Sequence, residues 1–103
     1  MRVLQLIDTL HPGGAERMAV NLANTFSELE IPHRLVVSRK HGDLGKLVHF
    51  QEGLTILEKK KTLDWKAFNK LLKIIDEFKP AVVHAHGTSV YWGVGVKFFS
   101  PQN

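Results

Sequence analysis

The sequence predicts an α/β domain of the Rossmann-like type, in which a parallel sheet carries helices on both faces. Short apolar runs alternate with longer segments whose apolar residues recur at steps of three and four. These are the patterns of buried strands and of amphipathic helices. Such an order calls for parallel strands joined by right-handed crossovers. Four strands are predicted, which makes an incomplete doubly wound domain.

The N-terminal part predicts two strands with a helix between them. Residues 3–7 form a nearly continuous apolar run, which suits a strand covered on both faces. A helix follows a glycine turn and is expected to end near residue 30, because Pro32 cannot continue it. Residues 35–37 form the second strand. The stripe predicted to face the sheet is Ala15, Met18, Ala19, Leu22, Ala23, Phe26 and Leu29.

The middle of the chain predicts a short helix and a third strand. Asp43 could cap a helix that runs to Phe50, because aspartate is a favoured N-cap residue. Its inward residues would be Leu44, Leu47 and Val48. Gly53 ends this segment, and residues 54–57 form the strand. The polar link at 58–62 includes three lysines, fewer than the four to eight expected of a lipid-binding cluster, so a solvated link is favoured.

The C-terminal part predicts a long helix, a fourth strand and a last helix. Asp64 is the expected N-cap of the long helix, which stops at Lys79 before Pro80. Its predicted buried stripe is Phe68, Leu71, Leu72, Ile75 and Phe78. The fourth strand begins at residue 81 and ends in a glycine-terminated turn, and residues 90–99 form the last helix.

Composition limits the partners without identifying one. The 103 residues allow one domain, and the net charge of +4 favours anionic partners such as phosphates. The absence of cysteine fits a reducing cytoplasm, and no apolar run approaches the ~20 residues of a membrane span. No signal peptide is expected. Basic residues are scattered and aromatic residues are not interleaved with them, which argues against nucleic-acid binding.

The loop after the first strand is a candidate phosphate-binding turn. It contains Gly13 and Gly14 at the start of a helix, where backbone N–H groups and the helix dipole favour an anion. His11 lies in the same loop. The chain lacks the G-x-G-x-x-G and P-loop patterns, so a ligand-free glycine loop remains an alternative. Glu16 is expected to support the helix start, and Arg17 either contacts an anion or lies exposed.

The loop after the fourth strand carries two histidines. His84 and His86 are two positions apart, so on a strand both point the same way. Without a nearby cysteine or carboxylate they do not make a metal site. His86, at the carboxyl end of the strand, is the better candidate for a ligand contact, whereas His84 is expected to pack in the sheet. Gly87 and Tyr91 follow as further candidates.

The remaining histidines and aromatic residues receive structural interpretations. His33, His41 and His49 are expected at loop or surface positions. Trp65 is expected to pack on the long helix, while Tyr91 and Trp92 follow the His86 loop closely and could line a cleft there.

Two motifs resemble a known family. These are Pro12-Gly13-Gly14-Ala15-Glu16-Arg17, which leads into Met18-Ala19-Val20-Asn21-Leu22-Ala23, and Lys79-Pro80-Ala81-Val82-Val83-His84-Ala85-His86-Gly87. With their spacing, they resemble the N-terminal domain of family-4 retaining glycosyltransferases. The resemblance implies two Rossmann-like domains across a cleft. The turn at Gly13 and Gly14 would lie beside the donor diphosphate, and His11, His86, Gly87 and Tyr91 would be candidates for the acceptor side.

The resemblance also implies what this chain does not contain. In the family, the C-terminal domain holds the nucleotide-sugar with a motif of two glutamates. Residues 1–103 would therefore be a partial N-terminal domain, inactive by itself. The implied partners are a nucleotide-sugar donor, a sugar or lipid-linked acceptor, and the C-terminal domain of the same chain. No metal cofactor is implied. A cytoplasmic protein, with possible peripheral contact at the inner face of the membrane, is expected.

The alternative interpretation is a non-catalytic, flavodoxin-like domain that binds a nucleotide or phosphate. A related receiver domain would need clustered acidic residues at the strand ends to hold magnesium. Asp8 has no acidic neighbour there, which argues against a receiver. Quenching of flavin mononucleotide fluorescence by the chain would favour the flavodoxin version.

Overall fold

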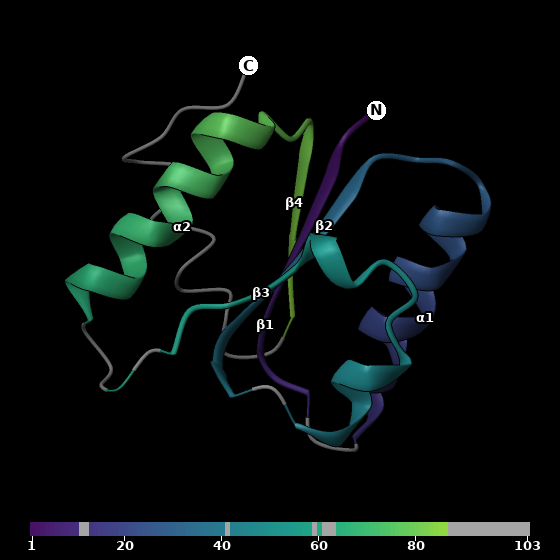
Figure 1. Ribbon diagram of the computed structural model, residues 1–103, viewed down its shortest axis with the longest axis horizontal. Coiled ribbons are helices and arrows are strands. Elements are labelled where there is room, and N and C mark those ends of the chain that lie inside the picture. The colour runs from purple at the N-terminus through teal and green to yellow at the C-terminus, as the bar shows by residue number, and fades with distance from the viewer. Residues whose placement is uncertain (11–12, 41, 59, 61–63, 87–103) are drawn as a thin grey trace.

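The computed structural model describes residues 1–10, 13–40, 42–58, 60 and 64–86. It confirms the predicted fold class, a four-stranded parallel sheet with helices on both faces (Figure 1). The strands are β1 (Val3–Thr9), β2 (His33–Lys40), β3 (Leu54–Ile56) and β4 (Val82–Ala85), in the spatial order β3-β2-β1-β4. The helices are α1 (Gly14–Glu28) and α2 (Trp65–Phe78), with short 3-10 helices η1 (Asp43–Leu47) and η2 (Gln51–Gly53).

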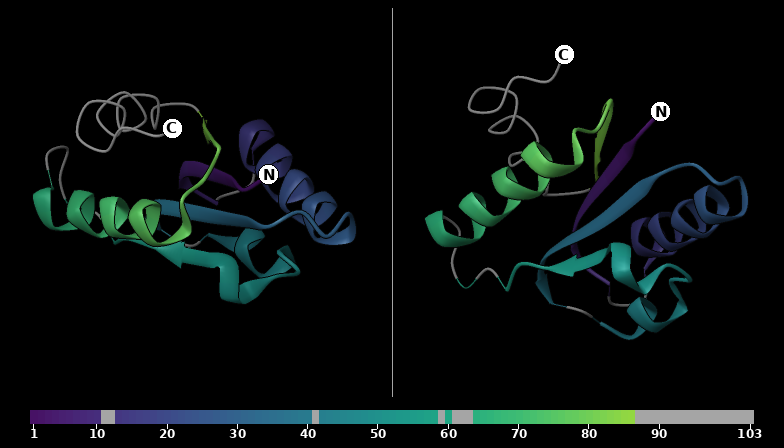
Figure 2. Two further views of the ribbon diagram at one scale, coloured as in Figure 1. Left: turned by 90° about the horizontal axis from the view of Figure 1, so that it is seen from above. Right: turned by 45° about the horizontal axis from the view of Figure 1, so that its top comes forward.

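The two faces of the sheet have separate hydrophobic cores. In Figure 1 the sheet lies between α2, in green, and α1, in blue, and the right-hand view of Figure 2 shows the same separation. Alternate residues of a strand point to opposite faces. Leu4 and Leu6 of β1 therefore join the cluster under α2, while Ile7 joins the cluster under α1.

Helix α1 is rotated relative to the stripe that the sequence predicts. The buried residues are Ala19, Val20 and Ala23, while Met18 and Leu29 of the predicted stripe are exposed. Two alanines at the contact let the helix backbone lie close to the sheet, and this orients the larger Met18 outward. The helix ends at Glu28, two residues before the predicted end.

The segment after β2 is a 3-10 helix rather than an α-helix. Its N-cap is Gly42, at a φ of 65° that favours glycine. The prediction that Asp43 caps this helix is therefore wrong. Leu44 and Val48 are buried as predicted, but Leu47 is exposed.

Helix α2 follows the sequence prediction closely. The Asp64 carboxylate accepts a hydrogen bond from the Ala67 N–H at 3.1 Å, which confirms the N-cap. Leu71 and Ile75 are buried, and Phe68, Leu72 and Phe78 pack around them. Trp65 is mostly exposed, with an edge contact to Phe68, so its predicted packing is wrong.

His33 is not at the surface, contrary to the prediction. It is the first residue of β2, is 4% exposed, and lies between the rings of Phe26 and Phe50. Its Nε2 atom is 2.9 Å from the Ser27 hydroxyl. The predicted helix at 90–99 lies outside the described residues. None of the helices in the described ranges is long and apolar enough to span a membrane.

Candidate functional site

Strands β1 and β4 meet where the strand order reverses. They pair in parallel, from Val3 with Val82 to Leu6 with Ala85, and the His86 N–H continues the ladder by donating to the Leu6 carbonyl at 2.9 Å. Their carboxyl ends point toward the lower edge of Figure 1, where α1 also begins. In open parallel sheets this is where ligands bind.

The glycine turn places an open stretch of backbone at this edge. Gly13 is the N-cap of α1, with extended dihedral angles, and no side-chain bond caps the helix there. The first helical hydrogen bond runs from the Arg17 N–H to the Gly13 carbonyl at 3.0 Å. The N–H groups before Arg17 therefore precede the helical ladder. A Cβ built at Gly14 meets nothing within 4 Å, so this position is open to an approaching group.

Glu16 folds back over the turn, at the position predicted to support the helix start. Its Oε1 atom would lie 2.7 Å from a Cβ built at Gly13, so the carboxylate occupies the space that a larger residue at Gly13 would need. Negative charge is favourable in the first turn of a helix. Arg17, the next residue, is exposed.

His86 belongs to a buried hydrogen-bond chain that joins three elements. Its Nε2 atom is 2.9 Å from Gln5 Oε1, and Gln5 Nε2 donates to the Ala19 carbonyl of α1 at 3.0 Å. The two residues are only 7% and 1% exposed, respectively. Buried polar groups require hydrogen-bond partners, and this chain supplies them. The position of His86 is therefore fixed against both β1 and α1.

His84 is exposed on β4, which corrects the prediction that it packs in the sheet. Its ring stacks on His86, with ring centroids 4.2 Å apart. Burial, followed by the neighbouring His84, lowers the pKa of His86, and the Glu16 carboxylate acts in the opposite direction. Because α1 begins directly after β1, and β1 pairs in parallel with β4, the start of α1 and the end of β4 lie at the same edge of the sheet, called the rim below.

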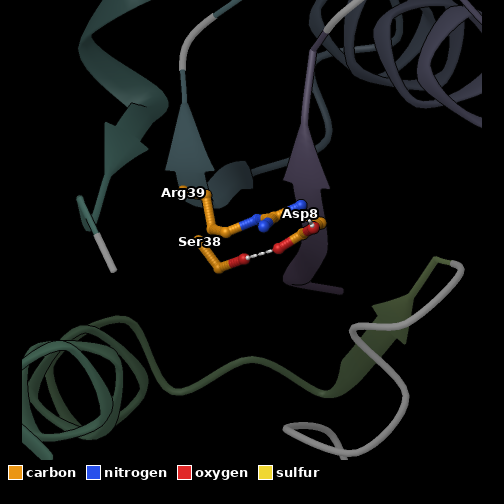
Figure 3. A network of polar contacts seen from close by, with 3 residues as sticks. All are labelled: Asp8, Ser38 and Arg39. Carbon is orange, nitrogen blue, oxygen red and sulfur yellow. Dashed lines mark hydrogen bonds and ion pairs between the residues drawn. The ribbon is translucent and has the colours of Figure 1, made fainter. Parts of the chain in front are cut away.

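A second polar network lies at the ends of β1 and β2 (Figure 3). Ile7 pairs with Val37 and Thr9 with Lys40, so Asp8 faces two residues of β2, Ser38 and Arg39. Strand β2 has one residue more than β1 between these two pairs, which makes a β-bulge. The Ser38 hydroxyl donates to Asp8 Oδ1 at 2.7 Å, and Arg39 Nη2 is 2.7 Å from Asp8 Oδ2. The bulge therefore lets one carboxylate bind both neighbours.

A comparison with protein families identifies this domain. The model of Glycosyltransferase Family 4 matches residues 12–100, which include the glycine turn, both helices and β4. The chain belongs to glycosyltransferase family 4. This confirms the resemblance carried by the two sequence motifs. Comparisons with curated proteins and with solved structures gave no significant match.

Within this glycosyltransferase domain, the structure brings some of the predicted residues together. Gly13, Gly14 and Glu16 follow the end of β1, and His86 follows the end of β4, so they lie at the same edge of the sheet. His11, Gly87 and Tyr91 lie outside the described residues. The described ranges contain no cluster of three or more His, Cys, Asp or Glu residues that could hold a metal ion.

Sequence reasoning missed four polar residues of the glycosyltransferase domain. Gln5 was available as a signal, because it is the one polar residue in the apolar run at 3–7. Asp8, Ser38 and Arg39 follow apolar strand cores, but their meeting depends on the bulge and so on the strand register.

Proposed function

We propose that this domain is the acceptor-side half of a retaining glycosyltransferase. The complete enzyme would move a sugar from a nucleotide-sugar donor to a sugar or lipid-linked acceptor. A C-terminal domain of the same protein would hold the nucleotide and supply the acidic motif. Family membership supports the sugar-transfer chemistry. The finer proposal rests on one structural observation, the open backbone at Gly14 at the same edge of the sheet as buried His86.

The start of α1 is suited to the charge that develops in this reaction. As the bond between the anomeric carbon and the donor oxygen breaks, negative charge accumulates on the departing nucleoside diphosphate. The exposed N–H groups of the first helical turn and the helix dipole favour such charge, by about 0.3–1 kcal/mol and up to ~2 kcal/mol where partly buried. Gly14 leaves room for the phosphate because no side chain covers the backbone there.

His86 is suited to the other partner in the reaction. The acceptor hydroxyl forms the new bond to the anomeric carbon, on the face that the leaving group occupied, and loses its proton. A neutral imidazole can accept a hydrogen bond from such a hydroxyl. The lowered pKa of His86, caused mainly by burial, favours the neutral ring near pH 7.

Cofactor, location and partners follow from the same proposal. The nucleotide-sugar is a substrate, and no metal cofactor is proposed. The protein would act in the cytoplasm, at the inner face of the membrane if its acceptor is lipid-linked. Net charge of +4 is compatible with peripheral contact to an acidic surface, because opposite charges attract there.

The test introduces a side chain at Gly14 in the full-length enzyme, with UDP-glucose and GDP-mannose as donor probes. Gly14→Val should lower kcat/KM for the donor by about tenfold to thirtyfold, equivalent to the loss of about 1.4–2 kcal/mol at the helix start. Asn21→Val is the matched control, because it adds the same side chain at an exposed position further along α1. Equal activity of the two variants would remove the glycine turn from the donor site.

A companion variant tests the rim as a whole. His86→Ala should reduce turnover with acceptor present, since it removes the imidazole beside the turn. Full activity in both His86→Ala and Gly14→Val would show that sugar transfer occurs elsewhere.

A further inference from the structure

We propose that Gln5 is a positioning residue that holds His86 as the tautomer protonated at Nε2, which leaves Nδ1 as an acceptor for a substrate hydroxyl. The tautomer follows from hydrogen bonds that are present in the domain itself. Only the identity of the hydroxyl, as one on a sugar acceptor, rests on the proposed function.

The direction of the hydrogen-bond chain is set at its α1 end. The Ala19 carbonyl can only accept, so the Gln5 group that faces it at 3.0 Å is the amide nitrogen. Gln5 Oε1 then faces His86 Nε2 at 2.9 Å. An amide oxygen also can only accept, so Nε2 must carry the ring proton. A neutral imidazole has one N–H, and Nδ1 therefore keeps its lone pair.

The opposite arrangement is unfavourable because it would leave buried groups unpaired. Rotating the Gln5 amide by 180° would place Oε1 against the Ala19 carbonyl, where neither oxygen can donate. Gln5 is 1% exposed, so water would not replace the lost bond. An unsatisfied buried polar group typically costs about 1–3 kcal/mol. The fold thus selects one amide orientation and, through it, one histidine tautomer.

The surroundings of His86 leave its Nδ1 atom for an external donor. Among the described residues, the hydrogen bonds of His86 are made by its Nε2 atom, with Gln5, and by its main-chain N–H, with Leu6, and none is made by Nδ1. His84, stacked on the ring, and the Glu16 carboxylate are the titratable groups that act on His86. Burial opposes protonation of the ring, so Nδ1 is available to a hydroxyl near neutral pH.

The tautomer can be measured directly on the 103-residue chain. Two-bond 1H–15N correlation spectra of 15N-histidine-labelled protein at pH 8 report which ring nitrogen carries the proton. We expect His86 to show a protonated Nε2 and an unprotonated Nδ1. Gln5→Met, which keeps the size of the side chain and removes its hydrogen bonds, should convert His86 to a mixture of tautomers.

Gln51 provides the matched control. It also makes two hydrogen bonds to backbone carbonyls, those of Gly45 and Val48, but belongs to η2. Gln51→Met should leave the His86 signals unchanged. A wild-type His86 protonated at Nδ1, or an unchanged single tautomer in Gln5→Met, would overturn the proposal. The wild-type spectrum alone decides if Gln5→Met fails to fold.

The functional part is tested in the full-length enzyme. Gln5→Met should lower kcat/KM for the acceptor by about threefold to tenfold, the range expected for one hydrogen bond, with little change for the donor. If the wild-type protein holds a single tautomer, Gln5→Met has a mixture, and kcat/KM for the acceptor is nevertheless unchanged, Nδ1 has no role in acceptor binding. Because the spectra require no substrate, failure of the proposed function would leave the tautomer result standing.

Discussion

The two faces of the sheet are built differently. Under α2 the buried cluster is entirely apolar and is formed by Leu4, Leu6, Val36, Leu57, Ala67, Leu71 and Ile75. On the α1 side the apolar cluster is accompanied by buried polar residues, Gln5 and His86 at the rim and His33 at the start of β2. Within the described ranges, the buried polar residue on the α2 side is Ser38, at the end of β2, and the rest of that face provides packing, whereas the α1 face holds several oriented polar groups.

This difference shows where the domain gains stability and where it places chemistry. Burying polar groups is unfavourable unless each finds a partner, so they add little net stability. Gln5 and His86 are nevertheless buried and hydrogen-bonded to each other, and His86 lies at the edge of the sheet where ligands are expected. His33, at the amino end of β2, is remote from that rim along the strand. Burial alone therefore does not distinguish the two histidines, and His86 is the candidate because of its position at the carboxyl ends of the strands.

The largest expected effect tests the apolar face. Leu71→Ala should lower the free energy of unfolding by about 2–5 kcal/mol, because Leu71 is fully buried under α2 and its loss leaves a cavity. Leu29→Ala, at an exposed position beyond α1, should change it by no more than about 0.5 kcal/mol. Urea unfolding of the chain measures both. Similar values for the two variants would contradict a stabilising core under α2.

A smaller effect is expected at the start of α2. Asp64→Ala should cost about 0.5–2 kcal/mol, because the carboxylate caps the helix through the Ala67 N–H and also accepts from the Lys60 N–H at 3.0 Å. Asp43→Ala is the control, since no side-chain bond caps η1. Helix α1 also starts without a side-chain cap. A large loss of folding stability in Asp64→Ala would therefore show that the start of α2 depends on its cap, in contrast to the start of α1.

The polar face should make stability depend on pH. Burial, with a smaller contribution from Arg34, lowers the pKa of His33 below its ordinary 6.5, and burial likewise lowers the pKa of His86. As pH falls below about 6.5, the unfolded chain binds protons before the folded one does, so stability is lost until the folded-state pKa is passed. Above that window the histidines remain neutral in both states and stability is retained.

Urea midpoints at several pH values between 5 and 8 measure this loss. His33→Leu should reduce the pH dependence and leave a remainder attributable to His86, whereas Trp65→Leu, at an exposed site, should leave it unchanged. A wild-type stability that rises as pH falls from 7 to 5 would contradict the sign worked out above.

The sequence was sufficient for the fold because strong periodic patterns carry that information locally. Every residue predicted for the stripe of α2 packs in the cluster, since large apolar residues dominate it, and only the small, buried Ala67 was not predicted. In α1, Ala19 and Ala23 were predicted to be buried and are, but Val20 was missed and Met18 was placed inward, because the contact is centred on the two small alanines rather than on the larger residues. His33 was misplaced because the residues around it come from two other segments, Phe26 and Ser27 from α1 and Phe50 from the start of η2.

The site was only partly predictable because its contacts are long-range. The glycine turn and His86 could be found from loop composition at strand ends, but Gln5 and His86 are 81 positions apart in the chain. Nothing local links a glutamine in the first strand to a histidine after the fourth. The bulge that gathers Asp8, Ser38 and Arg39 depends on register, which strand patterns do not specify at their ends.

The smallest expected effect concerns that bulge. Arg39 is 55% exposed and Asp8 24% exposed, so their ion pair should contribute only about 0–1 kcal/mol. A double-mutant cycle with Asp8→Asn and Arg39→Gln measures this coupling by urea unfolding, and the coupling should shrink further when NaCl is raised from 0.05 to 1 M because salt screens exposed charges. Ser38→Ala is the companion variant, since it removes the other partner of Asp8 and leaves the ion pair in place. A coupling above about 2 kcal/mol would mean that the network at the ends of β1 and β2 also stabilises the fold electrostatically. The contrast between an apolar face and a polar face of the sheet would then hold only away from the strand ends.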